Sequence, residues 1–170
     1  MMEKFRWLAA VIAAHPDHRV VGRTRLQKTV KLLQRLGAPM DYDYMIHFYG
    51  PYSEGVQADI GLLERFELVR EKECVSRRDQ STYFVLEATG PAQQFALRPE
   101  VAKFHKPIQI MSQTDPVVLE LAATYDAFRE MGEDHATASQ RLKRKKGTKC
   151  DHGRDQKALE LLRQLKLPTA

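Results

Sequence analysis

The chain has 170 residues, 43% of them hydrophobic and 29% charged, which are the proportions of a folded globular protein. Lys and Arg number 27 against 22 Asp and Glu, a net charge of +5 that permits nucleic-acid binding without requiring it. Two distant cysteines, Cys74 and Cys150, exclude a disulfide framework. Since no apolar stretch approaches the roughly 20 residues that span a bilayer, we expect a cytoplasmic protein without a membrane partner.

The first two predicted helices are separated by a proline. Helix Met2–Ala14 ends before Pro16, because the residue that precedes proline avoids helical geometry. The second helix begins at Thr24, where Thr24 and Gln27 have the spacing of a capping box. It ends at Gly37, since glycine readily adopts the left-handed conformation of a helix end.

An aromatic segment follows and predicts one strand. Residues alternate between apolar and polar from Tyr42 to Phe48, as in a half-buried strand, which places Tyr42, Tyr44 and Phe48 on its buried face. Gly50-Pro51 ends the strand, and Ser53 is the expected cap of a third helix, Val56–Phe66.

Two extended segments, Leu68–Val75 and Thr82–Leu86, are joined by a polar turn and predict a hairpin. Helix, helix, strand, helix and hairpin is the order of a winged-helix unit, with the hairpin as its wing. We therefore expect an α+β, mostly helical protein with a winged-helix-like domain over residues 1–90.

Residues 91–170 are expected to form a helical extension packed on that domain. Pro99 and Pro107 interrupt the segment Ala92–Ser112, which predicts two short pieces or a kink. Three more helices are expected, at Pro116–Met131, Asp134–Lys145 and Arg154–Leu167.

The third helix has the wrong charge for reading DNA. A winged helix usually lays this helix in the major groove, where basic and amide side chains contact base edges. Here its polar residues include four carboxylates and a single cation: Glu54, Asp59, Glu64, Glu67 and Arg65. Phosphate repulsion along this face argues against sequence-specific reading.

Basic residues cluster elsewhere and are the candidate phosphate ligands. One group surrounds the second helix and another lies on the wing: Arg19, Arg23, Arg25, Lys28 and Lys31, then Lys72, Arg77 and Arg78. A third group is the densest positive run of the chain, which Lys149 extends: Arg141, Lys143, Arg144, Lys145 and Lys146. Two alternatives remain open, a solvated cationic face and cations that compensate the dipole at a helix end.

Exposed aromatic and acidic residues are candidates for contacts with a protein partner. Tyr49 and Tyr52 flank the Gly-Pro corner, where stacking on bases is an alternative to packing. Together with Glu54 and Glu64 they form the expected protein-interaction surface. The helical extension also permits a homodimer.

No catalytic or metal-binding signature is present. The histidines are scattered and the Cys150-Asp151-His152 trio lacks a second ligand pair at zinc spacing. A glycine-rich phosphate loop is absent. We therefore expect no cofactor, no metal and no enzymatic activity.

Several motifs resemble a known family. Gly22–Lys28, Tyr49–Ser53 and the pairs Asp59-Ile60, Leu62-Leu63 and Leu68-Val69 are similar to small prokaryotic YwgA-like proteins, and the likeness continues through Leu119–Thr124 and Ala158–Leu162. A more distant resemblance is to the SocA-type antitoxin (Panacea) domain, which implies toxin neutralisation and contacts with degradation machinery. This chain has a longer C-terminal helical part.

Two functions follow from these features. The first is a nucleic-acid-associated regulatory or defence-linked protein, a DNA-binding or transcription factor that contacts phosphates with low specificity. The second is an adaptor or antitoxin that binds a protein partner without DNA.

Overall fold

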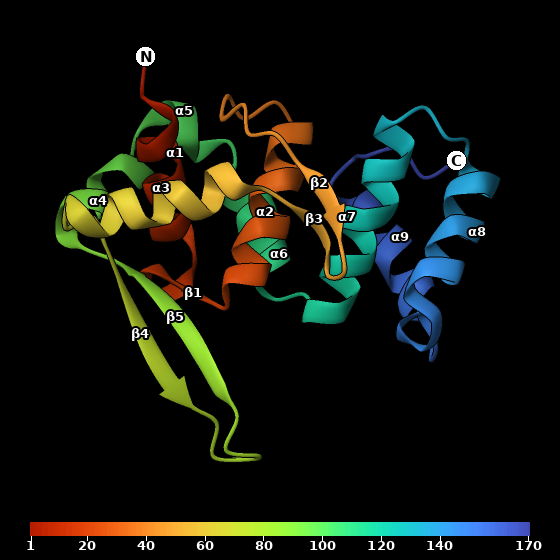
Figure 1. Ribbon diagram of the computed structural model, residues 1–170. Helices are drawn as coiled ribbons and strands as arrows, with labels where there is room; N and C mark the ends of the chain where they lie inside the picture. Colours follow the sequence, from red (N-terminus) through yellow and green to blue (C-terminus); the bar gives the residue numbers. More distant parts are fainter.

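The chain folds into nine α-helices and five short strands, which confirms an α+β, mostly helical fold (Figure 1). The computed structural model describes all 170 residues. The first half contains α1 (Lys4–Ala14), β1 (Arg19–Val21), α2 (Arg23–Arg35), β2 (Met45–His47), β3 (Gly50–Tyr52), α3 (Glu54–Arg65), β4 (Val69–Val75) and β5 (Thr82–Ala88). The second half contains α4 (Gly90–Ala96), α5 (Pro99–Ala102), α6 (His105–Ser112), α7 (Pro116–Glu130), α8 (His135–Lys146) and α9 (Arg154–Gln164). Two 3₁₀ turns, η1 (Pro16–His18) and η2 (Gly147–Cys150), complete the chain.

The main sheet is antiparallel, has the strand order β1-β5-β4, and includes a strand that the sequence pattern did not predict. β1 pairs with β5, with Val20 opposite Leu86 and both side chains buried. Because β1 lies between α1 and α2, the elements follow the order helix, strand, helix, short hairpin, helix, long hairpin. This is a winged-helix-like order in which β1, and not the aromatic segment, supplies the first strand.

The wing is the β4–β5 hairpin, confirmed almost residue for residue. It projects farther from the body than any other element (Figure 1). Only its base enters the core, through Val69, Leu86 and Ala88. The outer part of the ribbon therefore has both faces in contact with solvent.

The aromatic segment forms a second, short hairpin where a single strand was expected. β2 and β3 have three residues each, and His47 pairs with Gly50 across a two-residue turn. Phe48 therefore lies in the turn and is 77% exposed, so its predicted place on a buried strand face is wrong. Tyr42 is buried but precedes the strand.

Helix starts follow the sequence in most cases. Ser53 and Asp134 accept hydrogen bonds from first-turn backbone N–H groups, and Asp115 caps α7 in the same way. The capping box at Thr24 and Gln27 is wrong, because Gly22 precedes α2 and no side chain caps it. Gln27 instead exchanges two hydrogen bonds with the backbone of Ser53, at 2.8 and 2.9 Å.

The segment with two prolines forms three short helices, α4, α5 and α6. Pro99 opens α5, while Pro107 lies in the first turn of α6, where a missing N–H costs no helical hydrogen bond. Pro107 therefore does not break the helix.

One hydrophobic core runs through both halves of the chain. α7 lies between α2 on one side and α8 and α9 on the other (Figure 1), and it supplies the fully buried Tyr125 and Phe128. α4 packs along α1. The helices after residue 90 thus share the core of the winged-helix-like unit. None of the helices has the length and apolar composition needed to cross a bilayer.

Candidate nucleic-acid interface

Two of the lysines expected on a solvated face of α2 are buried. The Lys28 ammonium donates to the carbonyl of Pro51 at 2.7 Å. Lys31 pairs with Glu130 at 2.8 Å. These cations hold β3 and α7 against α2, so they do not lie on an open surface as the sequence predicted.

Arg25 is also committed to the fold. Its guanidinium donates to the carbonyls of Met111 and Thr114, at 2.7 and 2.9 Å. These carbonyls lie at the end of α6, where backbone acceptors lack helical partners. Arg25 therefore links the start of α2 to the end of α6.

A buried charge cluster lies behind the β2–β3 turn, centred on Glu120 of α7. This carboxylate accepts from Lys146 at 2.6 Å and from Lys149 at 2.9 and 3.1 Å. Lys146 also donates to the carbonyl of Phe48 at 2.8 Å. The cluster thus attaches the end of α8 to the turn of the short hairpin.

Lys28 belongs to the same electrostatic environment. Its pKa is lowered to about 8, mainly by burial; Glu120 opposes this shift, while Lys146 and Lys149 add to it. Burial also lowers the pKa of Lys146, while its hydrogen bond to Glu120 opposes that shift. Two ammonium groups pair with the Glu120 carboxylate and Lys28 is the third cation near it, so the cluster has two positive charges in excess.

The β2–β3 turn presents two aromatic rings to solvent. Phe48 is 77% exposed and Tyr49 is 57% exposed, and their rings meet edge to face at 5.0 Å. The Lys149 ammonium lies 5.5 Å from the first ring centroid and 4.9 Å from the second. Such cation–π contacts orient the rings without covering them.

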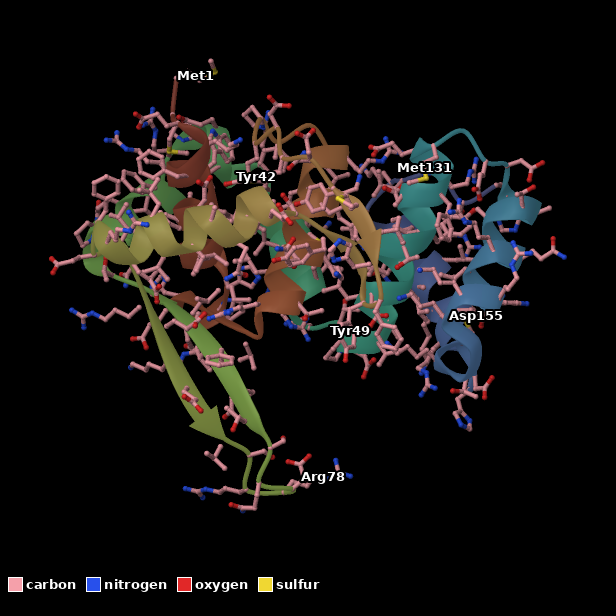
Figure 2. The ribbon with its side chains drawn as sticks, viewed as in Figure 1. Met1, Tyr42, Tyr49, Arg78, Met131 and Asp155 are labelled. Atoms are coloured by element: carbon pink, nitrogen blue, oxygen red, sulfur yellow. The ribbon has the colours of Figure 1, made fainter.

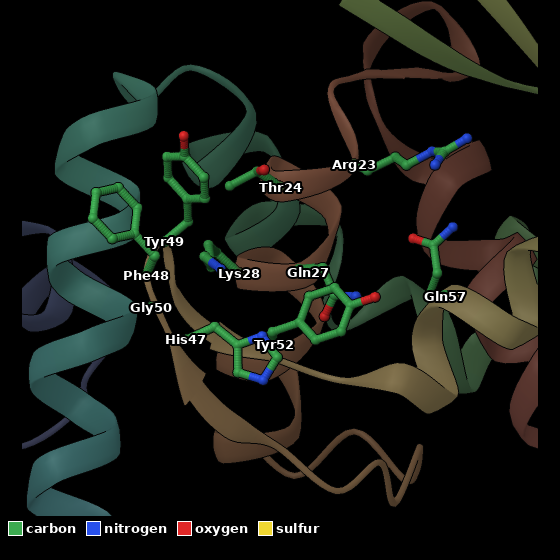
Figure 3. Close-up of a pocket in the computed structure, with 10 residues that line it drawn as sticks. All are labelled: Arg23, Thr24, Gln27, Lys28, His47, Phe48, Tyr49, Gly50, Tyr52 and Gln57. Atoms are coloured by element: carbon green, nitrogen blue, oxygen red, sulfur yellow. The ribbon is translucent and has the colours of Figure 1, made fainter.

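A cavity of about 640 Å³ lies between this turn, the start of α2 and the first turns of α3. Figure 3 shows the Lys28 side chain pointing into it between the Tyr49 ring and the His47 and Tyr52 rings. The last two rings are stacked at 4.9 Å. The cavity contains no carboxylate among its ten lining residues, which are Arg23, Thr24, Gln27, Lys28, His47, Phe48, Tyr49, Gly50, Tyr52 and Gln57.

Arg23 forms the edge of the cavity that is nearest the wing. Its guanidinium makes a bidentate ion pair with Glu71 of β4, and this hydrogen bond raises the pKa of Arg23. It also lies over the Phe84 ring at 4.8 Å. Arg23 therefore joins α2 to the base of the wing.

The tip of the wing contains free cations. Arg77 and Arg78 are exposed and make no ion pair, and Figure 2 shows Arg78 at the far end of the ribbon. The turn is ordered by Asp79, which accepts from the backbone and hydroxyl of Ser81. Nearer the base, Lys72 pairs with Glu87 at 2.9 Å. Arg19 of β1 is exposed and unpaired.

The basic run at the end of α8 is divided between the surface and the interior. Arg141 pairs with Glu133 and lies over the Phe128 ring, and Lys143 is 3.7 Å from Asp155. The exposed cations without an ion pair are Arg144 and Lys145. Lys146 is buried in the Glu120 cluster.

α3 keeps the acidic surface that the sequence indicates. Glu54 and Glu64 are exposed, and neither forms an ion pair. Asp59 accepts a hydrogen bond from the Tyr42 hydroxyl at 2.6 Å. Of the two tyrosines expected to be exposed, Tyr49 is exposed and Tyr52 is half-buried in the cavity wall.

Two contributors to this site were missed in the sequence: Glu120, which centres the cluster, and Phe48, which is exposed. Lys149, at the end of the predicted basic run, contacts the exposed rings. A signal for the first exists, since Glu120 is the only charge in the apolar run Val117–Ala123, and a lone carboxylate there must find a partner. No three His, Cys, Asp or Glu side chains are grouped to hold a metal ion.

Comparison with protein-family models and with curated proteins gives no match to this chain.

Proposed function

We propose that the protein binds single-stranded nucleic acid through its phosphates and by stacking of bases, without reading their sequence. The observation that carries this proposal is the pair of exposed rings, Phe48 and Tyr49, beside Lys149 and a cavity without carboxylates. Exposed rings next to cations are the usual platform for single strands, because every base has a π-face.

The wing supports a second contact with the same strand. Arg77 and Arg78 have no carboxylate partner, so phosphates compete with nothing but water for their guanidinium groups. Figure 2 shows Tyr49 and Arg78 on the same side of the molecule. A strand that stacks on the turn can therefore extend toward the wing.

The charge of α3 favours a single strand over a duplex. Glu54 and Glu64 occupy the exposed face that would enter a major groove, where phosphates flank both sides. Contacts through the turn and the wing avoid this face. In the proposed complex the winged-helix-like scaffold therefore contacts the strand through the β2–β3 turn and the wing, and not through α3.

Fluorescence anisotropy with labelled mixed-sequence strands, and with the matching duplexes, tests the proposal. We expect tighter binding to strands and affinity that falls steeply with salt, since bound counterions are released. Phe48→Ala with Tyr49→Ala should weaken binding by about 1–3 kcal/mol for each stacked base. Phe66→Ala is the matched control, because this ring is exposed directly after α3 and lies outside the cavity. Absence of salt-sensitive binding to any strand contradicts the proposal.

The acidic face of α3 favours a second candidate, an adaptor that binds a basic protein segment. The helix has two unpaired carboxylates and is followed directly by the exposed Phe66, an arrangement that suits a cationic, partly apolar peptide. A lysine-rich peptide that binds the wild type and not a Glu54→Lys/Glu64→Lys variant would support this function. Equal binding by both proteins would exclude α3 as the surface.

A further inference from the structure

The charge cluster behind the cavity has an imbalance that the fold does not explain. Lys146 and Lys149 pair with the single carboxylate of Glu120. Lys28 feels the charges of all three groups but donates only to a backbone carbonyl. Buried charges in folded proteins are normally paired, because an isolated charge loses its hydration. Two positive charges in excess would be compensated by one doubly charged anion.

The cavity gives such an anion access to Lys28. This side chain lines the cavity and points into it (Figure 3), and one of its three donors is occupied by the carbonyl of Pro51. The start of α2 lies at the same wall, where Thr24 lines the cavity and no side chain caps the helix. Backbone N–H groups at such a helix start add to the attraction of an anion.

The opposite wall is flat and aromatic. His47 and Tyr52 are stacked with an interplanar angle of 20°, and Gln57 of α3 lies beside them as a hydrogen-bonding side chain. Stacked rings suit a planar heterocycle, and a volume of about 640 Å³ lies within the range of small-ligand sites. The cavity therefore combines a place for an anion with a place for a base.

We propose that this cavity binds a nucleotide with a terminal phosphate monoester, either at the end of a strand or as a free nucleoside monophosphate. A phosphate monoester has a charge near −2 at neutral pH, since its second pKa is about 6. An internal phosphodiester has only one negative charge. The excess charge of the cluster thus favours a strand end over the middle of a strand.

This inference rests on the proposed function where the nucleotide is the end of a strand. The test distinguishes failure of the cavity inference from failure of single-strand binding. Anisotropy is measured with three strands of the same sequence. One has a 5′-phosphate, one has a 3′-phosphate, and one has hydroxyl groups at both ends. Isothermal titration calorimetry measures free nucleoside monophosphates and the corresponding nucleosides. We expect one phosphorylated end to bind at least about tenfold tighter than the hydroxyl strand, as charge-assisted hydrogen bonds to a phosphate would give.

Two cavity variants and one matched control locate the effect. Lys28→Met removes the ammonium group, and Thr24→Ile fills the cavity without touching the Glu120 cluster, so at least one is expected to fold. Each should abolish the preference for a phosphorylated end. Arg77→Ala/Arg78→Ala, on the wing, should weaken phosphorylated and hydroxyl strands alike and leave their ratio unchanged.

The outcomes are distinct. Equal affinity for phosphorylated and hydroxyl strands overturns the inference and leaves the proposed function standing. Binding of a nucleoside monophosphate but of no strand supports the cavity and overturns the proposed function. If neither strands nor mononucleotides bind, both are overturned.

Discussion

The protein has two antiparallel hairpins, and the cations beside them have opposite roles. The wing has seven residues in each strand, is joined at its base to β1 and to the core, and leaves Arg77 and Arg78 free at its tip. The β2–β3 hairpin has three residues in each strand and is too short to be stable alone. Lys28 and Lys146 hold it by donating to the carbonyls of Pro51 and Phe48.

The difference shows that a basic residue in this sequence can have either of two functions. Cations on α2 and at the end of α8 that face α7 stabilise the fold, whereas those at the wing tip remain available for phosphate. Charge counting alone does not separate the stabilising cations from the free ones, because both occur in basic stretches of the sequence. The four changes below test this division, from the largest expected effect on the free energy of unfolding to the smallest.

Glu120→Gln should destabilise the protein most. It leaves Lys146 and Lys149 without their carboxylate, and breaking a buried ion pair in this way costs about 3–5 kcal/mol. Urea unfolding measures the loss. The control is Glu73→Gln on the wing, an exposed carboxylate without an ion pair, which should change stability by less than about 0.5 kcal/mol. If both changes have a similarly small effect on stability, the Glu120 cluster does not stabilise the fold more than the exposed charges of the wing do.

Gly50→Ala should have the next largest effect. Gly50 has φ +88°, and a Cβ there would lie 2.5 Å from the Thr124 hydroxyl oxygen. We expect a loss of about 2–4 kcal/mol, combining left-handed strain with overpacking. Gly37→Ala separates the two costs, because Gly37 has φ +95° and open space around it. If thermal unfolding shows the same loss of stability for both variants, a Cβ at residue 50 does not clash with Thr124 of α7.

Lys28 should make stability depend on pH in an alkaline window. Its pKa is lowered to about 8 in the folded state from 10.5, so the unfolded chain binds more protons between these values and stability rises with pH. From pH 8 to 9.5 the gain should be about 1–2 kcal/mol. Lys28→Met should lack this gain. At higher pH, Tyr42 and Tyr44 have the opposite effect. Burial raises their pKa values, so their contribution makes stability fall as the pH rises. Parallel pH profiles of the two proteins would contradict the burial of a charged Lys28.

Arg77→Ala/Arg78→Ala should change stability least. Both side chains are exposed and unpaired, so the change in unfolding free energy should stay within about 0.5 kcal/mol. Affinity for single strands should nevertheless fall, and the slope of log affinity against log salt should decrease by about 1.4, or 0.7 for each lost phosphate contact. An unchanged slope would remove the wing from the interface.

Much of the fold follows from local sequence signals. Ser53, Asp115 and Asp134 cap helices as their residue types predict, and the wing lies where two extended segments flank a polar turn. β1 was missed because three residues are too few for alternation to show. Its pairing with β5, far along the chain, is a tertiary contact that no local pattern encodes.

The site was less predictable, because most of its contacts also join residues that are far apart in the sequence. Tyr49 is exposed as expected, and Arg77 and Arg78 lie where the sequence places them. Lys28, Lys31 and Lys146 are buried because α7 covers them, and nothing near them in the sequence indicates this. Gln27 could be assigned to a capping box or to a distant partner, and only the position of Ser53 decides between them.

The hydrogen bond from Lys146 to Phe48 joins residues 98 positions apart, and it sets an order of events during synthesis. A nascent chain that has reached residue 90 already contains α3 and both hairpins, the wing included. It still lacks Glu120, Lys146 and Lys149, which orient the exposed rings. The surface that we assign to nucleic acid is therefore complete only after α8 and η2 have been made, so an unfinished chain lacks the fixed geometry of the finished protein.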